Sequence, residues 1–564
     1  MSSGGEFDES IVFDTALGDR DSGASTVTDK LDDIRRQVKE RVDEEKAQLP
    51  PSEERPPIDS KFIQDCFFAN ALGDATLYAA LFRDRFVYCK DMREWFEWND
   101  NCWQRDLMDH SLAAVEKVSE QYLNEYRTVG EDIGKMTAAG ADEGKVEKLK
   151  ENQEALLKRV SQLRDDRRRT SCLKFAHTIK DPLAIVSDSL DLHPMLFPCA
   201  NGVIDLETGR LKPGRPSDYL SLASPVPFLD IDTPAPLWEK SLLEIFGGNS
   251  QKPKDAQGNE HAEEMIAYFQ RLLGYSITGL VKEKVFPVLY GRTGWNGRSL
   301  IMDTITHIMG NMAGPIQSEM LLSQKFSKSA AGPSPDIMTL KGLRIACASE
   351  TDENQRFSAS KIKWYTGTDQ LIGRWPNDKR PIRFDPTHTL FLMTNTQPKA
   401  PPNDKAFWER MHLIPFGISF VNRDPQESHE RRANLDLSRE IIAEYPGILS
   451  WLVRGCLIYQ RDGINPPKAV TEATEKYRRG EDLLADFIDE CCTREPGAKE
   501  KASILYSRFI DWYHENIGKD EPTGTWFGKQ LSQKFDKDKS NGCVVYFGIA
   551  LNGSQGELEG YNDK

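Results

Sequence analysis

The sequence has no CxxC pair and no cysteine–histidine group with zinc-finger spacing, although it contains ten cysteines in 564 residues. Scattered cysteines are typical of a reduced intracellular protein and argue against a disulfide scaffold. The N-terminus has no basic stretch followed by an apolar run, so we expect no signal peptide. Because no stretch approaches about 18 uninterrupted apolar residues, we also expect no membrane span.

Positive charge is in deficit, with 73 Lys and Arg against 88 Asp and Glu and a net charge of −15. This balance is unfavourable for DNA binding, which needs clustered Lys and Arg, but net charge says little about local patches. Residues 1–58 hold fifteen acidic and eight basic residues, whereas residues 281–420 hold twelve acidic and eighteen basic ones. The excess acid therefore lies largely outside the central segment.

The length and composition predict several domains. Residues 1–58 are rich in Ser, Gly, Asp and Glu and predict a disordered acidic leader. Residues 59–275 predict an α+β region that includes a long helical hairpin in 107–170. Within this region, residues 199–214 predict a strand hairpin whose turn lies at 207–209.

A glycine-rich loop follows the compact apolar strand of residues 285–290 and precedes an apolar helical segment. Strand, glycine-rich loop and helix form the context of a Walker A motif, in which backbone N–H groups and the helix N-terminus bind phosphate. The candidate ATP-binding residues are Gly291, Gly294, Asn296, Gly297, Arg298 and Ser299. Ser299 would supply a hydroxyl to Mg²⁺.

Two features of this loop depart from the Walker A pattern. It is one residue longer, and Arg298 stands where the pattern has lysine. An arginine keeps the charge, but its planar fork is larger than an ammonium group. We therefore expect nucleotide binding to survive better than hydrolysis, and a degenerate, non-hydrolysing loop stays an alternative.

Three candidate catalytic residues adjoin later apolar strands. Glu350 ends the strand of residues 341–350, Asn395 ends that of 389–395, and Arg410 precedes that of 411–416. Carboxyl ends of parallel strands meet beside the phosphate loop, so Glu350 could hold Mg²⁺-bound water and Asn395 could orient the attacking water. Arg410 suits an arginine finger. The alternatives are a turn-capping role for Asn395 and a surface ion pair for Arg410.

Residues 371–383 predict a basic, aromatic hairpin with Asn377 and Asp378 at its tip. Such a composition suits contact with single-stranded DNA, although an ordinary solvated hairpin is an alternative. The candidate DNA-binding residues here are Arg374, Trp375, Lys379 and Arg380, with Lys363 in the segment that leads into the hairpin.

The C-terminal region, residues 466–564, predicts helices at 482–491, 502–516 and 526–535 and then a strand at 543–549. Three helices followed by a β-wing outline a winged-helix-like domain, whose third helix would read DNA through Lys529 and Lys534. A role in packing or in binding a protein partner stays open.

The ordered motifs GxxGxNGxS, LKGxRxxxxSET, KxxTGTD, TN and WERxxLIPF resemble the superfamily 3 helicase module of phage and plasmid primase–helicases, which is akin to the poxvirus helicase-primase. The resemblance implies that Glu350 is the Walker B acid, which shares Mg²⁺ with Ser299. It also implies that Asn395 is the sensor and Arg410 the finger. It further implies a ring, usually hexameric, that moves 3′→5′ on single-stranded and forked DNA.

We therefore expect an α/β fold: a P-loop AAA+ helicase core at residues 276–465, between the α+β region and the winged-helix-like domain. The expected function is ATP-dependent DNA unwinding in the replication of a phage, plasmid or other mobile element, in the cytoplasm of a bacterial host. The short leader cannot hold a primase, so a separate primase or polymerase is expected as partner. The alternatives are a weakly hydrolysing scaffold or loader, and an origin-binding initiator.

Overall fold

The computed structural model describes residues 57–249, 256–324, 332–349, 355–376, 380–481, 483–516, 521–532, 534–540 and 543–552. The chain divides into two units, residues 1–62 and 63–564, and every helix and strand from α3 onward belongs to the second. Nearly all of the predicted leader lies outside the described residues, as do Glu350 and Lys379.

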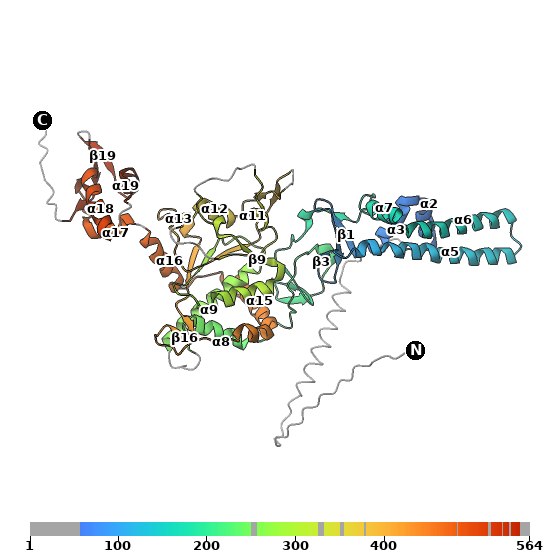
Figure 1. Ribbon diagram of the computed structural model, residues 1–564, viewed down its shortest axis with the longest axis horizontal. Helices are drawn as coiled ribbons and strands as arrows, with labels where there is room; N and C mark the ends of the chain where they lie inside the picture. The colour runs from blue at the N-terminus through green and yellow to red at the C-terminus, as the bar shows by residue number, and fades with distance from the viewer. Residues whose placement is uncertain are drawn as a thin grey trace, which may run out of the picture. The chain divides into compact units, whose positions relative to one another are not determined.

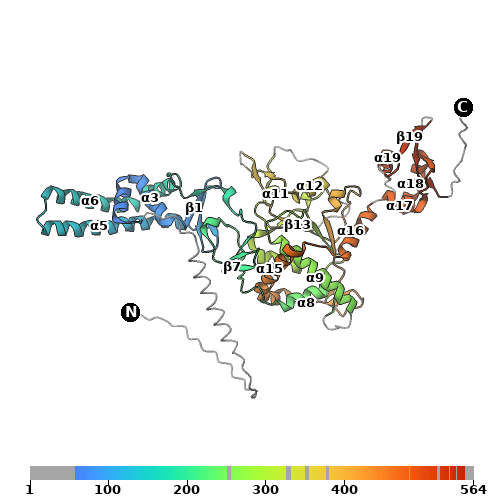
Figure 2. The same cartoon turned by 180° about the vertical axis from the view of Figure 1, so that it is seen from behind.

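The first part of the second unit combines helices with a small sheet. The helices that lie wholly in this unit are α3 (Asn70–Phe82), α4 (His110–Ala113), α5 (Val115–Ala138), α6 (Glu143–Leu163) and α7 (Asp166–Ala176), whereas α2 (Ser60–Phe68) crosses the boundary between the two units. The sheet has the order β3-β2-β1-β4, from β1 (Phe86–Cys89), β2 (Glu94–Trp98), β3 (Trp103–Arg105) and β4 (Ala184–Ile185). The predicted helical hairpin is confirmed, because α5 and α6 run side by side (Figures 1 and 2).

A buried ion-pair network holds the hairpin against α3. The carboxylate of Asp74 on α3 is fully buried and accepts hydrogen bonds from Arg159 Nη1 on α6 at 2.8 Å and Arg168 Nε on α7 at 2.8 Å. The hydroxyl of Tyr122 on α5 donates to the same carboxylate at 3.0 Å. One carboxylate therefore joins four helices.

Replacing Asp74 by Ala should lower the free energy of unfolding by about 3–5 kcal/mol, because two arginines would then face a buried site without their acceptor. Urea-induced loss of the helical circular dichroism signal measures this effect. As a control, Asp132→Ala removes an exposed partner of Lys135 and should cost less than about 1 kcal/mol. Equal costs for the two variants would contradict a stabilising role for the network.

A second small sheet follows, with the order β5-β6-β7. Its strands are β5 (Leu196–Cys199), β6 (Gly202–Asp205) and β7 (Arg210–Lys212). The predicted hairpin and its turn are confirmed. Asp205 Oδ1 accepts from the backbone N–H of Glu207 at 3.0 Å, and Gly209 takes a left-handed φ of +72°. Two helices come next, α8 (Pro236–Ile245) and α9 (Ala256–Ser276).

The central sheet has five parallel strands in the order β14-β8-β13-β10-β9. They are β8 (Phe286–Tyr290), β9 (Ala313–Ile316), β10 (Ile345–Ser349), β13 (Thr389–Thr394) and β14 (Met411–Pro415). The helices around it are α10 (Arg298–Met309), α11 (Pro335–Met338), α12 (Ala359–Tyr365), α13 (Lys405–Trp408), α14 (Leu437–Glu440) and α15 (Tyr445–Asp462). Two short strand pairs accompany the sheet: β11 (Leu371–Gly373) with β12 (Ile382–Phe384), and β15 (Ser419–Val421) with β16 (Glu430–Arg432).

Side chains of the central sheet enter two separate cores in alternation. Leu289, Ile345, Phe391 and Ile414 pack in one cluster with α8, α9, α10 and α15. Their strand neighbours Val288, Ala346, Leu390, Leu392 and Leu413 pack in the other, with α11, α12 and α13. Figures 1 and 2 show these two groups of helices on opposite faces of the sheet. Burial of both faces explains the continuous apolar runs of these strands and confirms the α/β class.

The segment Leu437–Asp462 is long and apolar enough to meet a length-and-composition test for a membrane span, and 56% of its most apolar window is buried. It ends in α15, where Ile448, Leu452 and Val453 are fully buried in the first core. Core helices of globular domains meet the same test. The described contacts therefore identify α15 as a core helix of the central sheet.

The C-terminal part begins with α16 (Lys468–Gly480), which the sequence did not predict. This helix packs against β14, and Thr474 Oγ1 accepts from the backbone N–H of Leu413 at 2.9 Å. Residues assigned to the C-terminal domain from sequence thus pack with the central sheet.

Beyond α16, three helices pack with short strands around a core that contains Phe487, Phe509, Phe527 and Tyr546. The helices are α17 (Leu483–Cys491), α18 (Ala502–Asn516) and α19 (Gly524–Leu531). The strands are β17 (Cys492–Thr493), β18 (Lys499–Lys501), β19 (Lys537–Ser540), β20 (Cys543–Phe547) and β21 (Ala550–Leu551), paired in the orders β18-β20-β19 and β17-β21.

Candidate functional site

The glycine-rich loop, residues 291–297, joins the end of β8 to the start of α10. Gly297 precedes α10 in a left-handed conformation with φ +85°. A Cβ atom at Gly291 would lie 1.9 Å from Asn296 Nδ2, which donates to the carbonyl of Thr293 at 2.7 Å. The loop therefore requires glycine at both ends. It leads into the first turn of a helix, where free N–H groups favour an anion.

Arg298 begins α10, but its side chain points into the sheet and is only 8% exposed. Its Nε donates to Asn296 Oδ1 at 2.9 Å, and Nη1 donates to the carbonyl of Leu289 at 2.9 Å. Nη1 also donates to the carbonyl of Thr394, and Nη2 donates to Asn395 Oδ1. Burial lowers the pKa of Arg298 from its ordinary value. The guanidinium therefore ties the loop to the ends of β8 and β13.

The carboxyl ends of three strands meet at this edge of the sheet. Tyr290 pairs with Thr394, and Ser349 pairs with Met393. Asn395 follows β13 directly and is exposed, which brings it to the loop as the sequence predicted. Glu350 lies outside the described residues, but it follows Ser349 at the end of β10 in the sequence.

The other loop residues are more open to solvent. Gly294 and Ser299 are exposed, and Trp295 is 82% exposed with a φ of +58°. The backbone N–H of Phe420 on β15 donates to the carbonyl of Trp295 at 2.7 Å, and Ser419 Oγ donates to that of Gly294 at 3.3 Å. Sequence reasoning did not find this support, because main-chain acceptors leave no motif.

Arg410 lies where the strands of the central sheet begin, at the opposite end of β8 from the glycine-rich loop. Its carbonyl accepts from the backbone N–H of Phe286, the first residue of β8, at 2.6 Å. At about 3.3 Å per residue, the length of β8 places that point roughly 13 Å from the loop. Arg410 Nη1 donates to the carbonyl of Ala406 at 2.6 Å, and the buried Nε has no hydrogen-bond partner among the described residues. The structure does not bring Arg410 to the loop of its own chain.

The predicted basic hairpin has antiparallel arms, β11 and β12, with Gly373 opposite Ile382. Trp375 is 42% exposed and Arg380 is exposed. The backbone N–H of Arg374 donates to Ser334 Oγ at 3.0 Å. The tip, residues 377–379, lies outside the described residues, so the two arms are confirmed and contact with DNA stays a prediction.

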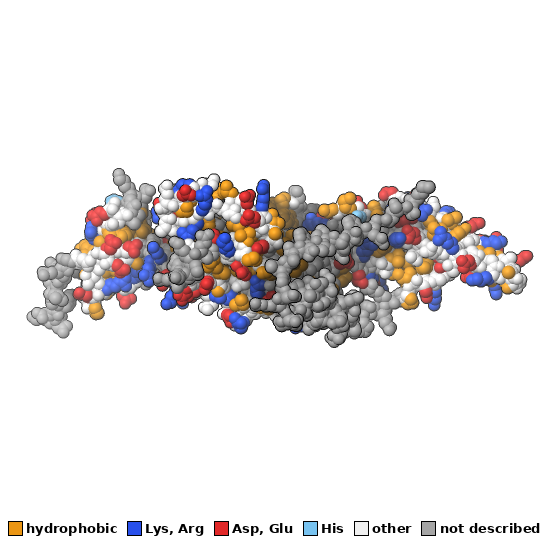
Figure 3. Space-filling view, turned by 90° about the horizontal axis from the view of Figure 1, so that it is seen from below, with side chains coloured by type: hydrophobic (Ala, Val, Ile, Leu, Met, Phe, Trp, Pro, Cys, Tyr) orange, Lys and Arg blue, Asp and Glu red, His pale blue; other side chains and the backbone are white. Residues whose placement is uncertain are grey.

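The remaining DNA-binding candidates are in varied settings. Lys363 forms an ion pair with Asp404 at 2.7 Å, a contact within the chain. Lys529 is exposed on α19. The expected third helix of residues 526–535 is too long, because α19 ends at Leu531 and Lys534 falls in the turn that follows. On the face seen in Figure 3, basic and acidic side chains are interspersed among the described residues.

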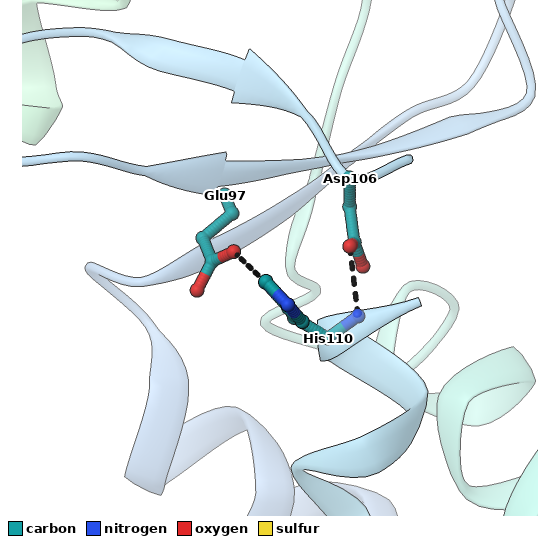
Figure 4. Close-up of side chains that lie close together, drawn as sticks. All are labelled: Glu97, Asp106 and His110. Carbon is teal, nitrogen blue, oxygen red and sulfur yellow. Dashed lines mark hydrogen bonds and ion pairs between the residues drawn. The ribbon is translucent and has the colours of Figure 1, made fainter. Parts of the chain in front are cut away.

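A potential metal-binding group lies elsewhere, at Glu97, Asp106 and His110, whose ligand atoms lie within 4.8 Å of one another (Figure 4). Asp106 accepts from the backbone N–H groups of His110 and Ser111 at 2.8 Å each, which caps α4. Glu97 pairs with Arg85 and hydrogen-bonds His110 Nδ1 at 2.6 Å, which raises the pKa of His110. These contacts identify Glu97, Asp106 and His110 as a hydrogen-bonded group that caps the start of α4.

Comparisons with known proteins show similarity to a described family and to viral candidate helicases and primases. The family described as D5 N terminal like matches residues 75–247. The candidate helicase L207/L206 of Acanthamoeba polyphaga mimivirus is 27% identical over 448 residues, which cover 77% of this chain and 44% of that protein. The candidate primase C962R of African swine fever virus is 25% identical over 346 residues, 58% of this chain and 34% of that protein.

Among solved structures, the C-terminal region of NrS-1 is similar over 65% of this chain and 100% of that chain, with 13% identity and a TM-score of 0.33. The family match and the viral relatives confirm the resemblance predicted from sequence: residues 75–247 are similar to the D5 N terminal like family, and the chain is similar to viral candidate helicases and primases. It spans less than half the length of these viral relatives.

Proposed function

We propose that the chain is an ATP-dependent DNA helicase that works as a ring, moves 3′→5′ along DNA, and serves the replication of a virus, plasmid or other mobile element. One observation carries the proposal. Arg298 links Asn296 of the glycine-rich loop to Asn395 at the sheet edge where β8, β10 and β13 end. The strand order β14-β8-β13-β10-β9 supports a P-loop AAA+ core, and α17 to α19 with β18 to β20 support a winged-helix-like domain.

The loop residues fit a nucleotide phosphate. Gly291 and Gly297 let the loop pack closely against Asn296 and Ile245, and the exposed Ser299 lies in the first turn of the twelve-residue helix α10. In this proposal Ser299 and Glu350 hold Mg²⁺, and backbone N–H groups of the loop bind phosphate oxygens. Bound Mg²⁺ would neutralise charge on the phosphates. Host cytoplasm as the location, and a separate primase or polymerase as partner, belong to the same proposal.

A second candidate function is an ATP-binding scaffold or loader with slow hydrolysis. The observation that favours it is the inward direction of Arg298, whose guanidinium donates four hydrogen bonds to this chain. A lysine ammonium would leave these carbonyls and reach a phosphate more readily. Fast turnover stimulated by DNA would exclude this candidate.

The test compares the wild type with a variant in which Lys379 and Arg380 are both Ala. We expect the wild type to hydrolyse ATP faster with single-stranded DNA and to unwind a fork. Removing one cation that binds a phosphate should reduce the slope of log affinity against log salt by about 0.7. The variant should therefore bind DNA with a flatter slope and fail to unwind.

The matched control replaces Lys468 and Lys476, two exposed lysines of α16, by Ala. It removes the same charge away from the hairpin and should unwind like the wild type. If the hairpin variant instead kept its DNA affinity and lost ATP turnover in the absence of DNA, the hairpin would belong to the nucleotide site or a subunit interface. A wild type without any ATP turnover would refute the helicase proposal.

A further inference from the structure

The contact between Arg298 and Asn395 fixes which end of the asparagine amide is free to act. A guanidinium group has five N–H donors and no acceptor. The atom of Asn395 that receives the Nη2 hydrogen bond must therefore be its oxygen, Oδ1, and not its nitrogen. The NH₂ group of Asn395 is consequently the end that does not face Arg298.

Arg298 is itself held firmly in this orientation. Four hydrogen bonds from its guanidinium reach Asn296 Oδ1, Asn395 Oδ1 and the carbonyls of Leu289 and Thr394. Those carbonyls belong to neighbouring parallel strands, β8 and β13, so the guanidinium plane is set by the sheet. A lysine could not supply the same planar fork. Arginine at this position therefore orients Asn395 in a way that lysine would not.

We propose that Arg298 is a positioning residue that turns the amide of Asn395 so that its NH₂ group donates to the terminal phosphate of a bound nucleoside triphosphate. This inference rests on the proposed function. Asn395 is exposed at the end of β13, beside the loop that would hold the phosphates. In this role Asn395 is a donor that distinguishes ATP from ADP. An asparagine that aligned attacking water through its oxygen would need that oxygen free.

Asn395→Asp tests the direction of the hydrogen bond. Aspartate keeps an acceptor for Arg298, now charge-assisted, but it has no donor and places negative charge beside the phosphate. We expect the melting temperature without nucleotide to stay the same or rise. Affinity for a non-hydrolysable ATP analogue with Mg²⁺ should fall at least about tenfold, as for loss of a hydrogen bond to a charged group, while ADP affinity changes much less.

Three further variants separate positioning from general damage. Gln397→Ala, an exposed neighbour two residues on, should leave the ratio of ATP to ADP affinity as in the wild type. Arg298→Met, which removes the donors to Asn395 without adding a cation that could reach a phosphate, should lower that ratio in the wild-type background. In the Asn395→Ala background, Arg298→Met should leave the ratio unchanged, because Arg298 acts through Asn395.

Each result decides the proposal. Wild-type selectivity in Asn395→Asp would overturn the donor role, and an equal effect of Arg298→Met in both backgrounds would overturn the positioning role. A wild type that binds neither nucleotide would refute the proposed function as well, whereas the other two results leave that function intact.

Discussion

Replacing Glu350 by Gln should lower steady-state ATP turnover by at least about 100-fold while ATP binding stays close to that of the wild type. Ser349, the residue before Glu350 in the sequence, ends β10 in register with Met393 on β13, two residues before Asn395. Gln keeps the size of the side chain but loses the charge that would hold Mg²⁺ or polarise the attacking water. Turnover with Mg²⁺ and the binding of a fluorescent ATP analogue measure the two quantities.

The same substitution at Glu353, three residues further along the chain, is the matched control. It should leave turnover near the wild-type value. If Glu353→Gln lost turnover and Glu350→Gln did not, Glu353 would be the catalytic acid. If neither variant lost turnover, the catalytic acid would have to come from another strand.

Four of the five strands of the central sheet were predictable because each is a short apolar run followed by a polar or glycine residue, whereas β9 (Ala313–Ile316), which contains Gly314 and Pro315, was not predicted. The predicted strand of residues 285–290 is β8, and that of 389–395 is β13. Both sheet faces are buried, so the apolar signal is continuous and does not depend on recognising an alternation. The meeting of Asn395 with the loop follows from parallel pairing, which the βαβ-like spacing favours.

The direction of the Arg298 side chain was not predictable. Its acceptors include the carbonyls of Leu289 and Thr394, which lie nine and 96 residues away. Every residue type has such a carbonyl, so no sequence pattern marks the ones that Arg298 meets. The ion pair of Lys363 with Asp404, 41 residues away, was missed for the same reason: it depends on the packing of α12 against α13.

Boundaries in the C-terminal part were the least predictable. α16 has few buried residues, Val470 and Tyr477, so its sequence resembles a surface helix. Its attachment depends on two hydroxyls: Thr474 Oγ1 accepts from the backbone N–H of Leu413 on β14, and the Tyr477 hydroxyl donates to the carbonyl of Pro398. The end of α19 at Leu531 was likewise misjudged, because the apolar Phe535 suggested a further turn of helix.

Arg410→Ala should lower ATP turnover by about 1,000-fold or more in a homogeneous preparation, the size of effect expected for an arginine finger. Arg410 lies at the edge of the sheet opposite the glycine-rich loop, so in a ring it would serve the ATP site of a neighbouring subunit. Glu350 would serve the site of its own subunit. Each active site would then contain Glu350 from one copy and Arg410 from the next.

Mixing Arg410→Ala subunits with Glu350→Gln subunits should therefore restore part of the turnover. Where the Arg410→Ala subunit supplies the loop and Glu350, its Glu350→Gln neighbour supplies an intact Arg410, and that interface is complete. The control mixes Arg410→Ala subunits with subunits that carry both substitutions, which leaves every interface defective. Native mass spectrometry verifies that mixed rings have formed. If ATP turnover recovers in the first mixture and not in the control, Arg410 acts at the ATP site of a neighbouring subunit. Equal inactivity of both mixtures would place Arg410 in the site of its own chain, against the geometry of β8 and β14.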